Sequence, residues 1–379
     1  MLIEFIYQKT NLYLLNSRLF STGIATVISF GLAISLFPFY ISFLRKFQMN
    51  SDFESKDKAV QPVMPAGILF LFIVIATALI TVRFNSYVIS SLIIYVFFGI
   101  IGAIDDIAKV VNKRRVIRGE ITKQQYQYKS DGISASLRLS LYLIISLIVA
   151  IIAYEYIPNI NGTINLPFIS ITKIFPYLPV WLFIPYMTLT IAILANGVNF
   201  TDGFDTLATV PSITCLIFVG VISFISSNVL WSSYLLIPYI EGGLQELLPL
   251  IGAVTGTLLA YLWYNSPPST IIMGDSGSVG LGGLIGILFV FTKAGFYLPI
   301  VGFIFLLEFV SVFIQIGYFK ITRKRIFLMA PIHHHYHIKM QKSGLYGGDF
   351  QIKSKIMWRF HILSVVLLVL GLVLFLKIR

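Results

Sequence analysis

The long apolar runs of this chain constrain its fold more than any other feature. Several of them hold 17 or more residues without a charged side chain, and 57% of the 379 residues are hydrophobic. A helix of about 20 apolar residues, rising about 1.5 Å per residue, crosses the hydrocarbon of a bilayer. The sequence therefore predicts an all-α, polytopic membrane helix bundle in contact with a lipid bilayer, organised as one domain over residues 1–379.

Hydropathy along the chain predicts ten membrane helices, of which the second and eighth are short. They are expected near residues 22–44, 67–82, 87–104, 135–154, 178–195, 209–225, 247–264, 279–292, 298–319 and 360–376. An even number of crossings puts both termini on the same side of the membrane.

The distribution of Lys and Arg predicts which side is which. Five loops share one side and hold 20 of the 28 Lys and Arg residues, the other side holds 7, and Arg138 stands inside a predicted helix. Cytoplasmic loops usually carry this excess, so we expect the five loops to face the cytoplasm and both termini to be periplasmic. The same pattern accounts for the net charge of +12 without a nucleic acid partner. The five loops are 45–66, 105–134, 196–208, 265–278 and 320–359.

Asp105 and Asp106 form the first of four polar clusters, all of which lie on the predicted cytoplasmic side. Lys109 follows one acid by four residues and the other by three, so on a helix it can face either. One interpretation is a solvated helix end with a local ion pair. The other is a site for a divalent cation or a shared proton, because two adjacent carboxylates repel each other.

The second cluster is a run of four amide and acid side chains spaced three residues apart. Three residues turn a helix by about 300°, so the four cannot share one helix face. Gly197 and Gly203 favour a broken or tight backbone, which would let these groups converge on one ligand. Ordinary capping and turn formation is the alternative. The four residues are Asn196, Asn199, Asp202 and Asp205.

The third cluster, Met273–Ser278, stands between two predicted spans, with Asn265 ten residues before Asp275. Its small residues allow a phosphate or a metal ion to approach the backbone, whereas a simple turn aspartate is the alternative. Gly282 and Gly286 follow with GxxxG spacing, which favours close helix packing over chemistry.

The fourth cluster is the run His333, His334 and His335. On a helix these side chains point about 100° apart, so they cannot easily ligate one metal ion. The zincin pattern HExxH is absent. The histidines are expected to donate to a phosphate or a nucleoside, or else to belong to a basic loop facing lipid headgroups. Earlier in the chain, Glu308 is either a paired, bundle-facing carboxylate or a direct participant, and Gln315 is a candidate substrate contact.

Together, these motifs resemble the phospho-N-acetylmuramoyl-pentapeptide transferases within the polyprenyl-phosphate N-acetylhexosamine-1-phosphate transferase superfamily. The resemblance spans roughly residues 56–376, and several motifs in the expected order are more specific than any one alone. The motifs are Gly102-Ala103-Ile104-Asp105-Asp106 with Lys109, Asn196–Leu207, Asn265–Gly277, Glu308–Gln315 and Met329–Tyr336.

The resemblance implies a Mg²⁺-dependent transferase of the bacterial cytoplasmic (inner) membrane. Its expected partners are UDP-MurNAc-pentapeptide and undecaprenyl phosphate, which would yield lipid I and UMP. One-step transfer and a covalent aspartyl intermediate are both left open, as is a homodimer. The alternatives are a sibling enzyme that transfers GlcNAc-1-phosphate to the same lipid and, outside enzymes, a transporter. A transporter would require inverted repeats and midplane charges, which are not evident here.

The family motifs also imply a role for each candidate residue. Asp275 would be a magnesium ligand, and Asp105 and Asp106 would serve the lipid phosphate. The residues that would line the nucleotide and pyrophosphate region are Asn196, Asn199, Asp202, Gly203, Phe204, Asp205 and Asn265. Those that would neutralise or contact phosphate are Lys109, Lys113, His333, His334 and His335.

Four places depart from the usual motifs of this superfamily. They are the segment 60–67, Thr206, Ile272 and His337, which stands where an acid usually follows the histidine run. These departures leave open which residues contact the uracil, and whether Lys58 contacts the nucleotide.

Overall fold

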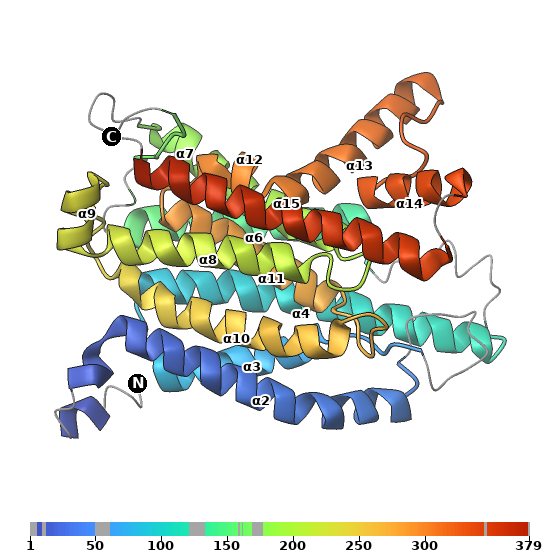
Figure 1. Ribbon diagram of the computed structural model, residues 1–379, viewed down its shortest axis with the longest axis horizontal. Helices are drawn as coiled ribbons and strands as arrows, with labels where there is room; N and C mark the ends of the chain where they lie inside the picture. The colour runs from blue at the N-terminus through green and yellow to red at the C-terminus, as the bar shows by residue number, and fades with distance from the viewer. Residues whose placement is uncertain are drawn as a thin grey trace.

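A computed structural model of the chain shows a bundle of roughly aligned helices (Figure 1). Within the described residues, eight helices are long and apolar enough to cross a membrane, and two shorter apolar helices accompany them. Every regular element there is helical. The prediction of an all-α polytopic bundle is therefore confirmed. The described residues are 6–9, 13–49, 61–120, 133–157, 160, 162–168, 177–344 and 347–377.

Each of the ten predicted spans overlaps one apolar helix, and the two predicted to be short are the two short ones, α3 and α11. The ten helices are α2 (Arg18–Lys46), α3 (Gly67–Thr81), α4 (Ser86–Ile117), α6 (Ala135–Tyr156), α7 (Val180–Thr201), α8 (Thr209–Ser226), α10 (Leu247–Asn265), α11 (Asp275–Phe291), α13 (Phe303–Thr322) and α15 (Asp349–Lys377). Shorter helices are α9 (Val229–Leu235), α12 (Leu298–Val301) and α14 (Ile332–Ser343), with 3₁₀ turns at Tyr13–Asn16, Leu244–Glu246 and Gly295–Tyr297.

Helix α11 occupies the centre of the bundle. All of its residues from Ser276 to Phe291 are buried. Two of its glycines explain how it comes so close to α7: a Cβ on Gly282 would lie 2.4 Å from the carbonyl oxygen of Leu194, and one on Gly286 would lie 2.8 Å from the Cα of Ile191. The expectation that these glycines serve helix packing is confirmed.

Several predicted boundaries were wrong. The segments 105–117, 196–201 and 349–359, assigned to loops, belong to α4, α7 and α15 as helix, and the predicted span 298–319 breaks at Gly302 into α12 and α13. Hydropathy identifies the part of a helix that crosses hydrocarbon, but backbone hydrogen bonding continues a helix beyond it. As a result, the first acidic pair lies on a helix rather than in a loop.

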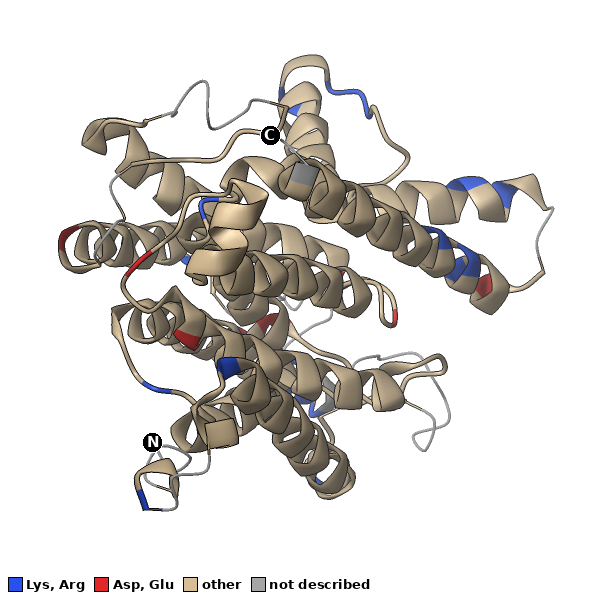
Figure 2. Ribbon diagram, turned by 60° about the vertical axis from the view of Figure 1, so that its left-hand side comes forward, with Lys and Arg blue, Asp and Glu red and all other residues tan. Residues whose placement is uncertain are grey.

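The two ends of the bundle differ in charge and shape. The start of α2 and the end of α15 lie at one end, while α14 and the far end of α13 project at the other (Figure 1). Lys and Arg residues gather on α14 and the first turns of α15, whereas the middle of the bundle carries few charges (Figure 2). All four polar clusters lie toward the side of α14, called here the motif side. Asp105 and Asp106 are within the second half of α4, and the other three clusters are at helix ends and connections.

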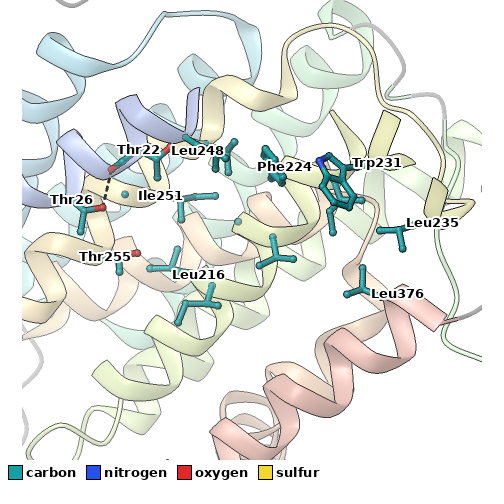
Figure 3. A pocket seen from close by; sticks show the side chains of 16 residues that line it. Thr22, Thr26, Leu216, Phe224, Trp231, Leu235, Leu248, Ile251, Thr255 and Leu376 are labelled. Atoms are coloured by element: carbon teal, nitrogen blue, oxygen red, sulfur yellow. Dashed lines mark hydrogen bonds between the residues drawn. The ribbon is translucent and has the colours of Figure 1, made fainter. Parts of the chain in front are cut away.

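An apolar groove of about 530 Å³ lies at the opposite end, between α2, α8 and α10 (Figure 3). Leucine and isoleucine make up half of its lining residues, with Trp231 at one side. The Thr26 hydroxyl that reaches it donates to the backbone carbonyl of Thr22 at 2.9 Å. No titratable side chain lines this groove, so it offers no chemistry and the site must be sought on the motif side.

Replacing Gly286 with leucine tests the central packing. The added side chain would meet the backbone of α7, and we expect overpacking to cost about 1–3 kcal/mol of stability. The measurement is the thermal unfolding midpoint in detergent. Gly31→Leu on α2 is the matched control, because nothing lies within 4 Å of a Cβ there. Equal midpoints for the two variants would contradict the packing described.

Candidate active site

The Asp106 carboxylate forms the N-terminal cap of α11. Its Oδ1 accepts the backbone N–H of Asp275 at 3.0 Å, and its Oδ2 accepts that of Ser276 at 2.9 Å. The first turn of a helix leaves such N–H groups without partners, and its partial positive charge favours an anion there. This buried pair of bonds joins α4 to the start of α11.

Two glycines allow this close approach. Gly274 has φ +76°, and a Cβ there would lie 2.7 Å from Asp106 Oδ2. A Cβ on Gly102, one turn before Asp106, would lie 2.4 Å from the carbonyl oxygen of Asp275. A side chain at either position would push the carboxylate away from the helix terminus.

The chain segment before α3 fixes the same helix terminus from another side. Val63 donates its N–H to the Thr270 carbonyl at 3.1 Å and accepts one from Ile272 at 2.8 Å. Gly67 donates to the Met273 carbonyl at 3.0 Å. The starts of α3 and α11 and the middle of α4 therefore meet at one point.

The side chain of Asp275 projects from this point into a cluster of four charges. Its Oδ2 lies 3.0 Å from Lys109 Nζ and 2.8 Å from Arg138 Nη1. The same two cations contact Asp105 Oδ2 at 2.7 and 2.8 Å. Asp105 also accepts the N–H of Ile133 at 3.0 Å, which ties the start of α6 to α4. Two acids and two bases thus share one small volume.

Arg138 is the site residue that sequence reasoning missed, since it was interpreted only as a charge inside a predicted span. A lone arginine within an apolar run is itself a signal, because such residues face the bundle interior and pair with acids. Its place one turn into α6 brings the guanidinium to both Asp105 and Asp275.

Asp202, at the C-terminal end of α7, extends the acidic part of the cluster. It accepts the backbone N–H of Gly274. Burial raises the pKa of this carboxyl well above its usual range, and the negative charges of Asp275, Asp106 and Asp205 raise it further.

The three predicted asparagines bind protein groups. Asn196 donates to the Ala192 carbonyl of its own helix at 2.8 Å. Asn199 accepts the Ser278 hydroxyl at 2.9 Å and so ties α7 to α11. Asn265 accepts the N–H of Thr206 at 2.7 Å and donates to the Ile271 carbonyl at 2.9 Å. Asn199 and Asn265 therefore join segments around the acids, whereas the bond of Asn196 stays within its own helix.

A hollow of about 500 Å³ with both polar and apolar lining residues adjoins the segment Gly203–Asp205. Lys353 Nζ stands 5.7 Å from the centre of the Phe204 ring, within cation–π range. Asp205 accepts the N–H of Ser269 at 3.4 Å on the rim. Two of the departing positions lie here as well, since Pro62 and Ile272 contribute to the wall. Lys58 lies outside the described residues.

The three histidines at the start of α14 take three different environments. His333 is buried and lies 3.2 Å from Glu308 through its Nδ1. His334 meets the Phe204 ring edge-on, and burial, followed by nearby positive charge, lowers its pKa to about 4, so it is neutral near pH 7. His335 accepts the N–H of Leu328 at 3.1 Å.

Two further candidates stand apart from the charge cluster. Gln315 accepts the N–H of Phe327 at 2.9 Å and lines a separate groove beside Lys320, Arg323 and Arg325. Lys113 follows Lys109 by four residues on α4 and is mostly buried.

No three His, Cys, Asp or Glu side chains among the described residues form a ready-made metal cage. Mg²⁺ rarely needs one, because it keeps several waters and is held by one or two carboxylates together with substrate phosphates. Asp275 and Asp202 offer the hard oxygen ligands that it prefers, and the negative charges of Asp275, Asp106 and Asp205 act on the Asp202 carboxyl. The residues present therefore fit a magnesium ion.

The sequence profile described as glycosyl transferase family 4 matches residues 88–293, which is more than half of the chain. The matched part contains Asp105, Asp106, Asp202 and Asp275. The chain belongs to glycosyl transferase family 4.

Curated relatives in this family match the chain over most of its length. It is 36% identical over 365 residues to the phospho-N-acetylmuramoyl-pentapeptide-transferase of a Nitratiruptor species, covering 94% of each chain. The protein of the same name from Bartonella quintana is 37% identical, with 92% of this chain and 91% of that protein covered. That from Nautilia profundicola is 32% identical, with 96% and 99% covered.

The capping role of Asp106 can be separated from the role of Asp275. In this family 4 protein, Asp106→Asn replaces one of the two accepting oxygens with an amide group that cannot accept. We expect the loss of a charged hydrogen bond to cost about 1.5–3 kcal/mol. The measurement is thermal unfolding in detergent. Asp275→Asn is the comparison, since the Asp275 side chain caps nothing, and a lower midpoint for Asp275→Asn than for Asp106→Asn would refute the assignment.

Proposed function

We propose that the protein transfers phospho-N-acetylmuramoyl-pentapeptide from UDP-MurNAc-pentapeptide to undecaprenyl phosphate, forming lipid I and releasing UMP. The observation that carries the proposal is the Asp275 carboxylate, which projects from a helix N-terminus between Lys109 and Arg138 and beside Asp202. Phosphate-to-pyrophosphate transfer brings several negative charges together, and such an arrangement of cations and oxygen ligands suits it. The names of the relatives supply the substrates.

The bonds exchanged follow from the substrates. An oxygen of the lipid phosphate attacks the phosphorus that carries the sugar, and the bond from that phosphorus to the oxygen of UMP breaks. The nucleophile is already largely ionised near neutral pH, so little base catalysis is needed. Lys109 and Arg138 screen the two approaching phosphates, and the backbone geometry held by Asp106 keeps Asp275 between them.

A Mg²⁺ ion bound here would supply charge neutralisation at the pyrophosphate. Asp275 and Asp202 are the residues that would hold it. Lys109 and Arg138, which share the Asp275 oxygen, would then be able to pair with the substrate phosphates.

The hollow beside Phe204 is the place for the uridine end of the donor. Its lining is part polar and part apolar, with Phe204 and Lys353 on its wall and Asp205 at its rim. A base can stack on the aromatic ring while Lys353 lies close enough to counter phosphate charge. Gly203, which lines the hollow, is the next residue in the chain after Asp202.

We place the protein in a bacterial cytoplasmic membrane with the motif side facing the cytoplasm. The excess of 20 Lys and Arg residues over 7 supports this orientation. It also suits a water-soluble nucleotide donor, whereas the lipid phosphate arrives at headgroup level with its chain in hydrocarbon.

Asp275→Asn tests the proposed chemistry. We expect Mg²⁺-dependent UMP release to fall by at least about 10²-fold, because the reacting phosphates lose electrostatic stabilisation. Release of radiolabelled UMP from UDP-MurNAc-pentapeptide, with undecaprenyl phosphate in detergent, is the assay. Glu155→Gln, an acid-to-amide change on the exposed surface of α6, should leave release unchanged. Near-normal release by Asp275→Asn would refute the proposal, and faster transfer from UDP-GlcNAc would favour the sibling enzyme.

A further inference from the structure

The pair Glu308 and His333 lies deep between α13 and α14. Glu308 is fully buried and His333 is 1% exposed. Glu308 Oε2 accepts the backbone N–H of His333 at 3.4 Å, and Glu308 Oε1 faces the ring Nδ1 at 3.2 Å. A buried carboxylate is costly without partners, so this contact with the first turn of α14 accounts for its place in the membrane helix.

The opposite edge of the His333 ring presses on the backbone of Gly203. A Cβ on Gly203 would lie 2.2 Å from Nε2 and 2.8 Å from Cε1 of the ring. The conformation of Gly203 is not among the left-handed ones, so this contact, rather than φ, demands glycine. The segment Gly203–Asp205 is therefore held from behind by the imidazole, while its other face lines the hollow beside Phe204.

The His333 ring is also covered from its sides. The Phe204 ring lies 4.8 Å away at 70°, and the His334 ring lies 4.2 Å away. Neither ring nitrogen of His333 has a hydrogen-bond partner among the described side chains and backbone groups, and almost none of its surface reaches solvent. The ring is enclosed by protein and does not line the hollow.

We infer that Glu308 and His333 are positioning residues that fix the donor-nucleotide hollow by supporting the Gly203 segment, and that His333 does not contact substrate. The inference rests on the proposed function for the identity of the donor. Glu308 fixes the position of His333, His333 fixes the Gly203 backbone, and the Gly203 backbone sets Phe204 and Asp205 against the nucleotide. A substitution that breaks the contact of Glu308 with His333, or of His333 with Gly203, displaces the nucleotide site without removing a reacting group.

A double-mutant cycle between Gly203 and His333 tests this chain of contacts. Gly203→Ala alone should raise the KM for the uridine donor on the order of 10²-fold, as expected for a shift of about 1 Å, with the KM for the lipid phosphate unchanged. His333→Ala vacates the space that the new methyl group needs. The double variant should therefore recover at least about tenfold of the lost donor affinity, a coupling that independent sites would not show.

Three controls make the result specific. His334→Ala in the Gly203→Ala background should give no recovery, because His334 meets Phe204, whereas the three atoms nearest a Cβ on Gly203 all belong to His333. Glu308→Gln should raise the donor KM, whereas Glu246→Gln, the same change at a buried acid paired with Arg18 at the opposite end of the bundle, should not. If Glu308→Gln does not fold, the Gly203 and His333 cycle still decides.

UMP binding by calorimetry repeats the cycle without turnover. If the wild-type protein releases no UMP in the transfer assay, the proposed function fails, while UMP binding still reports the coupling. A donor KM unchanged in Gly203→Ala, or a double variant no better than Gly203→Ala, would overturn the inference. So would loss of kcat in His333→Ala at unchanged donor KM, because that result would mean direct contact with the reacting groups.

Discussion

The site depends on the two hydrogen bonds that the Asp106 carboxylate accepts from the first turn of α11. They join two membrane helices that are far apart in sequence, and they place a carboxylate where the partial positive charge of a helix terminus stabilises it. Once this contact is formed, the direction of Asp275 is fixed. Lys109 and Arg138 both contact the Asp275 Oδ2 atom. Asp202 joins the cluster through its hydrogen bond with the backbone of Gly274.

Glycine makes this geometry possible in two ways. At Gly274 and Gly102, the absence of a side chain lets α4 approach the terminus of α11, and at Gly282 and Gly286 it lets α11 lie against α7. The buried central helix therefore serves as a rigid base for a polar cluster at its end. A site assembled on rigid helices positions its charges more accurately than one assembled on loops.

The sequence predicted the ten apolar helices, because each crossing must bury its own length in hydrocarbon. The sequence also indicated the acids of the site, because placing Asp105, Asp106 and Asp275 near the hydrocarbon of a membrane costs free energy and needs a functional reason. Distances between helices were not predictable: nothing local shows that Asp106 caps α11 or that Arg138 reaches both Asp105 and Asp275. The histidine run was taken as one group of substrate contacts, yet helical geometry turns His333 toward Glu308 and His334 toward Phe204.

The central claim is that helix capping by Asp106 builds a cation and phosphate site around Asp275. Anomalous diffraction from crystals soaked with Mn²⁺ and the uridine donor tests it most directly, because the ion can be located independently of activity. The account predicts a peak at the usual metal–carboxylate distance, about 2.0–2.2 Å, from an Asp275 oxygen, with Asp106 still bonded to the α11 terminus. With nucleotide bound, a peak remote from Asp275, or an ion on Asp106 with the α11 cap broken, would contradict it.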